Sequence, residues 1–248
     1  MSSNSTSPAA PAVPAAPATT TAYAGLVILG ATGGIGRQLV EQALTRGYAV
    51  TAVVRDPERL PVRHSRLTVQ IANVTSAEEL TQVLVATGAG AGSDAGEAQR
   101  SGAGTIAVLS ALGPRPGDSG TVTADGIEAA LTAMKTAGVR RILAVSAVPI
   151  GPPHGFVGRR LTFPLLWRFF GDGYRGLVRM EELLTASGAD WTVVRPPRLT
   201  DKEGTGKYRL GWEKALPWMT SLARADVADA MLSLLDDAES FGRAGAVG

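Results

Sequence analysis

The stretch LVILGATGGIG, residues 26–36, decides the fold of this chain. A run of aliphatic residues, typical of a buried strand, leads directly into glycines at positions 30, 33 and 36. The first glycine would permit a tight turn, and the last would let the following helix pack closely on the strand. The middle glycine would let the backbone approach a pyrophosphate. The GxxGxxG spacing between a strand and a helix therefore predicts a phosphate-binding turn.

The helix expected after the glycines would strengthen this site. The first N–H groups of a helix have no partner within it and carry a partial positive charge, so they attract an anion. A glycine triplet also occurs in ordinary strand–helix turns, but its position at the start of a βαβ unit favours a bound dinucleotide.

Aliphatic runs alternate with segments of helical period along the chain. Strands are expected at 25–30, 48–55, 67–74, 105–112, 140–148 and 190–197. Helices are expected at 35–46, 76–87, 125–138, 178–188 and 223–237, with Ser76 and Glu79 forming a capping box at the start of the second. This alternation predicts an α/β fold, a Rossmann-like doubly wound parallel sheet in a single domain over residues 23–248.

Three segments depart from the alternation. Residues 1–22 are rich in Ser, Ala, Pro and Thr, which predicts a disordered tail. Residues 88–104 are rich in Gly and Ala, which indicates a mobile insertion. Residues 149–173 are expected to form a long, partly helical excursion from the carboxyl end of the fifth strand.

Composition excludes several classes of chemistry. The 248 residues contain no cysteine, so there are no disulfides and no thiolate nucleophiles. The two histidines, His64 and His154, are far apart in sequence, and no metal site is expected. A net charge of +2 does not argue for nucleic acid or a membrane as a partner. A soluble cytoplasmic protein, monomer or homodimer, is expected.

The end of the second strand indicates which dinucleotide would bind. A free ribose 2′-hydroxyl is usually met there by Asp or Glu, whereas this chain has Arg55 directly after the strand and Arg59 one turn later. A guanidinium cannot accept from a hydroxyl, but it can bind a 2′-phosphate through two hydrogen bonds. Asp56 competes for the acidic role from one position further on, and both arginines could instead be solvated surface residues. The pattern favours NADP(H) over NAD(H).

Several motifs together resemble the atypical short-chain dehydrogenase/reductases. The matching stretches are GATGGIG, VVRDPERL, MKTAGVRRILAVSA, RMEELLTASGADWTVVRPPRLTD and TGKYR, between about residues 24 and 236. The most similar branch holds the NAD(P)H-binding proteins related to biliverdin-IXβ reductase (flavin reductase), and NmrA-like proteins are more distant.

This resemblance implies a position for each part of the cofactor. The pyrophosphate would lie on Gly30, Thr32, Gly33, Gly34, Ile35 and Gly36, and the 2′-phosphate on Arg55 and Arg59. The adenine would be flanked by Asn73, an Asp in most relatives, and Val74. The ribose would lie beside Ser110, Ala111, Leu112 and Gly113, and the nicotinamide near Val145, Ser146, Pro196, Pro197 and Arg198.

The resemblance also shows which catalytic groups are missing. Short-chain dehydrogenases use a Ser and a Tyr-x-x-x-Lys pair, in which the lysine lowers the tyrosine pKa. Ser146 keeps the serine position, but Tyr174 is followed four residues later by Val178 and Tyr208 by Trp212. Reversible alcohol–ketone chemistry is therefore disfavoured, and the catalytic candidates are Ser146 and Arg198. Arg198 replaces a histidine of the biliverdin-IXβ reductase branch.

Other charged residues receive a plainer interpretation. Glu181 and Glu182 are adjacent on a helix and point in different directions, so they are expected on a solvated face, with a weak ion pair between Glu182 and Arg179. Arg195 either orients a carboxylate or holds the edge of the sheet.

Hydride transfer to a conjugated acceptor needs only that a flat ring stack on the nicotinamide. The 149–173 excursion is rich in aromatic residues and contains arginines as well. It predicts a substrate lid, although a dimer surface or core packing would give the same composition. The proposed lid residues are Phe156, Phe163, Trp167 and Phe170.

The leading hypothesis is thus an NADPH-dependent reductase acting on a small planar substrate. A flavin, a quinone or, in secondary metabolism, a polyketide-like aromatic would fit. The alternative is an NmrA-like redox sensor that binds NADP(H) without turnover, and a structural protein with a vestigial site is a third reading.

Overall fold

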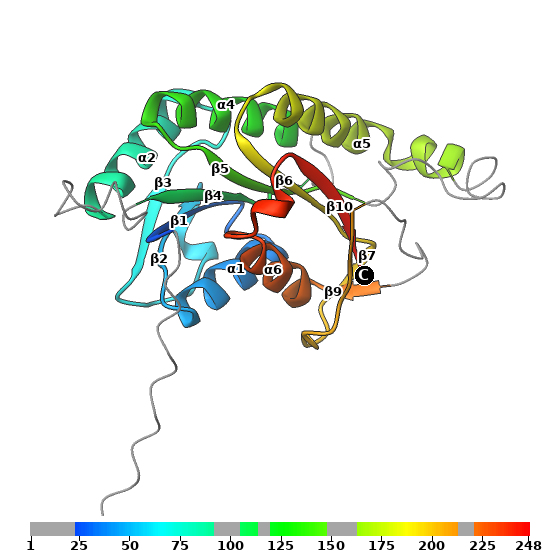
Figure 1. Cartoon of the computed structure of the whole chain (residues 1–248), viewed down its shortest axis with the longest axis horizontal. Helices are drawn as coiled ribbons and strands as arrows, with labels where there is room; N and C mark the ends of the chain where they lie inside the picture. Colours follow the sequence, from blue (N-terminus) through cyan, green and yellow to red (C-terminus); the bar gives the residue numbers. More distant parts are fainter. Residues whose placement is uncertain (1–22, 92–104, 114–119, 148–162, 213–220) are drawn as a thin grey trace, which may run out of the picture.

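The computed structural model describes residues 23–91, 105–113, 120–147, 163–212 and 221–248 (Figure 1). The strands are β1 (Gly25–Leu29), β2 (Ala49–Val54), β3 (Leu67–Ile71), β4 (Ile106–Ser110), β5 (Arg141–Val145), β6 (Asp190–Arg195), β7 (Arg198–Thr200), β8 (Leu210–Gly211), β9 (Ser221–Ala223) and β10 (Arg243–Val247). The helices are α1 (Gly34–Thr45), α2 (Ala77–Ala91), α4 (Val122–Ala137), α5 (Phe163–Ala186) and α6 (Arg224–Ser233), with 3-10 turns η1 (Pro57–Arg59) and η4 (Ala238–Ser240).

The main sheet has the strand order β3-β2-β1-β4-β5-β6-β10-β8. All neighbouring strands in it run parallel except β10 and β8, which are antiparallel. The order reverses between β1 and β4, as in doubly wound sheets, where ligands bind outside the carboxyl ends of the strands. A separate two-stranded parallel sheet is formed by β7 and β9. The predicted α/β fold with a single Rossmann-like domain is confirmed.

Helices cover both faces of the main sheet, α1 and α6 on one side and α2, α4 and α5 on the other (Figure 1). Side chains of β1 alternate between the two resulting cores. Leu26 and Ile28 pack in the α1/α6 layer, and Val27 and Leu29 pack in the layer of α2, α4 and α5. Because a strand covered on both faces has no solvated side, β1 is aliphatic throughout.

Several element boundaries differ from the predicted ones. The predicted helix 178–188 is the end of a 24-residue helix, α5, that already begins at Phe163, inside the predicted excursion. Residues 88–91 continue α2, so the start of the predicted insertion is helical. The tail 1–22, residues 92–104 of the insertion and residues 149–162 of the excursion, with Phe156, lie outside the described residues.

Only half of the predicted capping box forms at the start of α2. The Ser76 hydroxyl accepts a bond from the Glu79 N–H (3.3 Å). The Glu79 carboxylate, however, accepts from the N–H of Asn73 (2.8 Å). The Ser76 N–H already has a partner in the Asn73 carbonyl (3.0 Å), so the turn before α2 takes over the role that the carboxylate has in a full box.

Arg141 anchors the amino edge of the sheet. Its side chain is 1% exposed and lies over the Phe241 ring, with 4.3 Å between the guanidinium carbon and the ring centroid. Burial lowers the pKa of Arg141 to about 10, so the group is still charged at neutral pH. Five hydrogen bonds to main-chain and hydroxyl oxygens surround it, accepted by Leu235 O, Leu234 O, Asp190 O, Thr192 Oγ1 and Ser240 Oγ.

Candidate functional site

The turn after β1 has the geometry that its glycines predict. Gly30 has φ +75°, and a Cβ on it would lie 2.7 Å from the Ala111 carbonyl oxygen. A Cβ on Gly36 would overlap the Gly30 carbonyl and lie 2.8 Å from the Cα of Ala31. The first glycine therefore permits the turn, and the last permits the close contact between helix and strand.

The helix that follows presents an open N-terminus. Gly33 is the N-cap of α1, has no side chain to cap the helix, and no acidic residue occurs in the first turn. A Cβ on Gly33 would meet only the Gly30 carbonyl oxygen, at 3.2 Å. The unpaired N–H groups and the partial positive charge at the start of α1 are thus not neutralised by a side chain of the first turn.

A cavity of about 440 Å³ lies over this turn, at the carboxyl ends of β1 to β4. It brings together most residues predicted to hold the cofactor, namely Gly30, Thr32, Gly33, Gly34, Ile35, Arg55, Asn73, Val74, Ala111, Leu112 and Gly113. It is completed by Val53, Val54, Thr75, Val122 and Arg224, which were not predicted. Apart from Gly36, the residues predicted around the pyrophosphate and adenine thus share one cavity.

Other predicted residues do not line this cavity. Gly36 lies beneath the turn, Arg59 is exposed on η1, and Ser110 is buried at the end of β4. The residues expected near the nicotinamide follow β5 and β6, where Val145, Ser146 and Pro196 are buried, Pro197 is half-buried and Arg198 is exposed at the start of β7. Their contact with a cofactor is still a prediction.

The cationic residues after β2 lie beside the start of α1. Arg55 is exposed and lines the cavity, and Arg37 donates to the main-chain carbonyl of Arg59 (3.0 Å). Asp56, the competing acid, accepts from the N–H of Glu58 (3.1 Å) as the N-cap of η1. Among the described residues, no carboxylate forms a salt bridge with Arg55 or Arg59.

Asn73 braces the turn between β3 and α2. Its Oδ1 accepts from the N–H of Thr75 (3.1 Å) and from the Thr75 hydroxyl (3.0 Å). The amide oxygen of Asn73 therefore already has two donors within the protein. Asn73 lies in the cavity wall, and its contacts within the protein hold the loop in place.

A second polar group lies at the ends of β5 and β6. The Ser146 hydroxyl donates to Glu181 Oε1 (2.6 Å), and Arg195 binds the same carboxylate through Nε (3.0 Å to Oε1) and through Nη2. The Glu181 side chain is 13% exposed, so its predicted place on a solvated face is wrong. Glu182 is exposed and pairs with Arg179 (3.3 Å), as predicted.

The reason for this difference is the course of α5. The helix presents one face to the ends of β5 and β6, and adjacent residues on a helix point about 100° apart. Glu181 therefore points to Ser146 and Arg195, while Glu182 points to solvent. Of the two roles that the sequence left open for Arg195, the structure shows that it orients a carboxylate.

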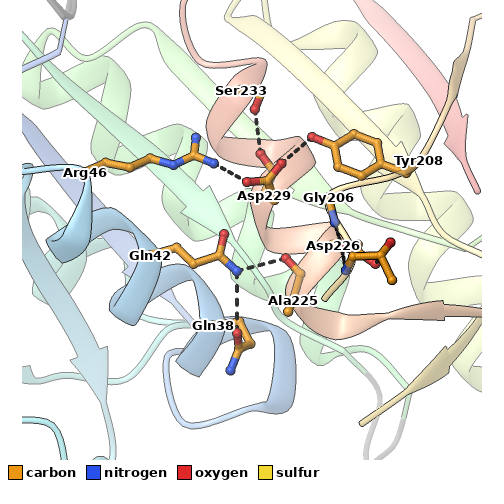
Figure 2. A network of polar contacts seen from close by, with 10 residues as sticks. Gln38, Gln42, Arg46, Gly206, Tyr208, Ala225, Asp226, Asp229 and Ser233 are labelled. Carbon is orange, nitrogen blue, oxygen red and sulfur yellow. Dashed lines mark hydrogen bonds and ion pairs between the residues drawn. The ribbon is translucent and has the colours of Figure 1, made fainter. Parts of the chain in front are cut away.

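Neither tyrosine considered from the sequence is prepared as a proton donor. Burial raises the pKa of Tyr174, and Val178 stands where a lysine would lower it. Burial and a hydrogen bond to Asp229 (2.6 Å) raise the pKa of Tyr208 to about 12. Tyr208 belongs to the network between α1 and α6, in which Arg46 also pairs with Asp229 (Figure 2).

Arg224, the first residue of α6, was not among the residues predicted from the sequence. Its side chain lies over the glycine turn, since a Cβ on Gly34 would overlap its Cδ and lie 2.7 Å from its Nε. The polar network holds α6 against α1, for example through the bond from Gln42 to the Ala225 carbonyl (2.9 Å, Figure 2). Because this packing joins distant parts of the chain, no local motif marks Arg224.

The proposed lid falls largely outside the described side chains. Phe163, Trp167 and Phe170 lie on the first turns of α5, where the structure describes the backbone only. In the parts of the chain that the structure describes, no helix has both the length and the apolar character needed to cross a bilayer.

The sequence profile of the NAD(P)H-binding family matches residues 30–238. The chain is 30% identical to an uncharacterized chloroplastic protein of Arabidopsis thaliana over 225 residues, which is 86% of this chain and 73% of that protein.

Two solved structures share the fold. A short-chain dehydrogenase/reductase from Veillonella parvula in complex with NADP is 21% identical, with a TM-score of 0.68 over 91% of this chain and 94% of that one. ChuY, an anaerobillin reductase from Escherichia coli O157:H7, is 20% identical, with a TM-score of 0.69 over 90% of this chain and 96% of that one.

Proposed function

This chain belongs to the NAD(P)H-binding family, and from that premise we propose that it is an NADPH-dependent reductase of planar, conjugated acceptors. A flavin, a quinone or a polyketide-like aromatic is the expected class of substrate. The observation that carries the proposal is the glycine turn. There the uncapped N-terminus of α1, Arg55 and Arg224 line one cavity.

The residues of the cavity suit the diphosphate of a dinucleotide. A diphosphate would meet the unpaired N–H groups at the start of α1, where Gly33 carries no side chain in the way. Arg224 lies beside this turn and supplies a further positive charge. Both features attract an anion, and neither is needed for an ordinary strand–helix connection.

Arg55 supports NADP(H) over NAD(H). It lines the cavity at the end of β2, where a ribose 2′-phosphate would lie, and a guanidinium suits that group. Asp56 caps η1 instead of facing the cavity as an acceptor for a 2′-hydroxyl. The Veillonella parvula neighbour, in complex with NADP, agrees with this preference.

The bound cofactor would supply the hydride, and the chain would orient the reacting groups. The Ser146 proton is directed at Glu181, so the lone pairs of Oγ remain as acceptors. We therefore assign Ser146 to hold the nicotinamide carboxamide as an acceptor, with Glu181 and Arg195 positioning it. Arg198 and the lid residues of α5 would contact the acceptor.

The missing Tyr-x-x-x-Lys pair is compatible with this chemistry. A conjugated acceptor delocalises the charge that arrives with the hydride, and solvent can supply its proton. The description of ChuY as an anaerobillin reductase agrees with a reductase of this fold that acts on something other than a simple ketone.

A screen of NADPH oxidation tests the proposal. We expect NADPH consumption in the presence of FMN, menadione or a related quinone, faster than with simple ketones or with NADH. Binding is measured first, by titrating NADPH and NADH against the intrinsic fluorescence of the protein. Absence of dinucleotide binding would refute both the cofactor and the reaction.

A redox sensor is the second candidate. The missing Tyr-x-x-x-Lys pair and the bond from the Ser146 hydroxyl to Glu181 are as compatible with a sensor as with a reductase. A sensor would bind NADP⁺ and NADPH with different affinities and would oxidise NADPH with none of the acceptors.

A further inference from the structure

We propose that Arg224 is a diphosphate-binding residue that exchanges partners when the cofactor binds. In the free protein its guanidinium pairs with Asp201, and in the complex it binds the diphosphate while Asp201 turns to solvent. The inference rests on the proposed function, because it assigns a further residue and a competing carboxylate to the same cofactor site.

The small sheet places these two residues together. β7 and β9 are parallel, and Thr200 is the register partner of Ala223. Asp201 directly follows β7 and Arg224 directly follows β9, so the two residues leave the sheet side by side. Their ion pair, with 2.6 Å between Arg224 Nη1 and Asp201 Oδ1, follows from this register.

Arg224 is held at the cavity by packing that does not involve Asp201. Its side chain crosses the glycine turn against Gly34 and lines the cavity. The helix that carries it is bound to α1 by the contacts of Gln42 with the Ala225 carbonyl and of Arg46 with Asp229 (Figure 2). The guanidinium therefore stays near the turn when its partner changes.

Asp201 is the mobile member of the pair. Its side chain is 88% exposed, against 30% for Arg224, so water screens the ion pair and Asp201 loses little when it turns away. The loop beyond it is anchored separately, since the buried Asp226 accepts from the N–H groups of Thr205 and Gly206, both at 2.8 Å. Only the Asp201 side chain has to move.

A diphosphate is the stronger partner for Arg224. It offers several anionic oxygens to the guanidinium and also binds the N–H groups at the start of α1. Asp201 offers one exposed carboxylate and has no such second contact at the turn. The Asp201 carboxylate thus competes weakly with the diphosphate for Arg224. It keeps the guanidinium oriented in the free protein and lowers the cofactor affinity by a small factor.

Arg224 and Arg55 would bind different phosphate groups of the cofactor. A diphosphate is common to NADPH and NADH, whereas a 2′-phosphate occurs only in NADPH. Loss of Arg224 should weaken both cofactors equally, and loss of Asp201 should strengthen both equally. Loss of Arg55 should change the ratio of the two affinities.

The test is a double-mutant cycle with NADPH and NADH titrations by fluorescence. Arg224→Gln should weaken both cofactors about tenfold, and Asp201→Asn should strengthen both about twofold to threefold. In the Arg224→Gln background, Asp201→Asn should have no effect, because its partner is gone. Arg224→Lys, which keeps the charge, should lie between Arg224→Gln and the natural chain.

Arg140→Gln is the matched control. It breaks a partly exposed ion pair with Asp190 at the opposite, amino edge of the sheet, away from the cavity, and should leave both affinities unchanged. If Arg224→Gln binds both cofactors like the natural chain, or Asp201→Asn changes nothing, the exchange is refuted while the cofactor site stands. If the natural chain binds neither dinucleotide, the proposed function fails as well.

Discussion

Arg141 at the amino edge of the sheet and Arg224 at its carboxyl edge are held in opposite ways. Arg141 is buried, and five oxygens of the protein accept its N–H groups. Arg224 has one ion pair with a carboxylate that is almost fully exposed. A guanidinium whose N–H groups all have acceptors within the protein stabilises the fold. One with only some of its N–H groups paired is available to a ligand.

The surroundings of the two edges follow the same division. At the amino edge, Thr192 and Ser240 bond each other as well as Arg141. At the carboxyl edge, the start of α1 lacks a side-chain cap, and the buried hydroxyls of Ser110 and Thr123 have no hydrogen-bond partner among the described residues. Unlike the groups around Arg141, these polar groups at the carboxyl edge have no partner among the described residues.

Replacing Arg141 should give the largest effect and should change stability alone. Arg141→Met would remove five hydrogen bonds, four of them buried, and we expect the free energy of unfolding to fall by about 3 kcal/mol or more. Urea denaturation measures this loss. Arg140→Gln, at the adjacent exposed ion pair with Asp190, should leave the midpoint nearly unchanged.

Gly33→Asp should separate binding from stability at the other edge. Gly33 has φ −77°, and a Cβ there would lie 3.2 Å from the Gly30 carbonyl oxygen, which requires a small shift of the turn. Because Asp is a favoured N-cap residue, we expect its cap to offset this shift and α1 to keep its stability. Its carboxylate would occupy the anion position and repel a diphosphate, which should weaken NADPH binding about 100-fold.

Fluorescence titration and thermal unfolding of the same Gly33→Asp sample measure both quantities. The uncharged cap Gly33→Ser should lose much less affinity than Gly33→Asp. NADPH binding by Gly33→Asp at the natural affinity would contradict the assigned site.

Arg55→Asp tests which residue at the carboxyl edge distinguishes NADPH from NADH. The change removes the partner of a 2′-phosphate and offers an acceptor to a 2′-hydroxyl, so the ratio of NADPH to NADH affinity should fall about 30-fold. Parallel titrations of both cofactors measure the ratio. Equal losses for the two cofactors would refute the role of Arg55.

Glu181→Gln should have the smallest effect. The neutral amide keeps the shape but weakens the contacts with Arg195 and Ser146, which should cost about 1 kcal/mol of stability and lower kcat a few-fold without a change in the KM for NADPH. Steady-state kinetics with the best acceptor from the screen measure this split. Glu182→Gln, one residue further along the same helix, is the control and should change neither quantity. A rise in KM alone would contradict a positioning role for Glu181.

The predictions from sequence succeeded where the signal is local. The GxxGxxG turn, the aliphatic core strands and the position of Arg55 are each defined by neighbouring residues. The strands form the doubly wound sheet, and the turn and Arg55 line the cavity at its carboxyl edge. β10 was missed because RAGAV lacks an aliphatic run, although it pairs with β6 in the main sheet.

Other misses come from long-range geometry. Glu181 was placed on the wrong face because the orientation of a helix depends on what it packs against, and its partners Ser146 and Arg195 belong to other strands. Arg224 depends on the pairing of β7 with β9 and on the packing of α6 against α1. No short pattern encodes those contacts.

Gly34 and Arg224 are 190 residues apart in the sequence, and their contact should make the two positions evolve together. A methyl group on residue 34 would displace the guanidinium from the turn, while the main-chain N–H groups below it would stay in place. In homologous chains we therefore expect the two positions to change together, with a bare glycine wherever a long cationic side chain faces it and a shorter residue wherever position 34 carries a side chain.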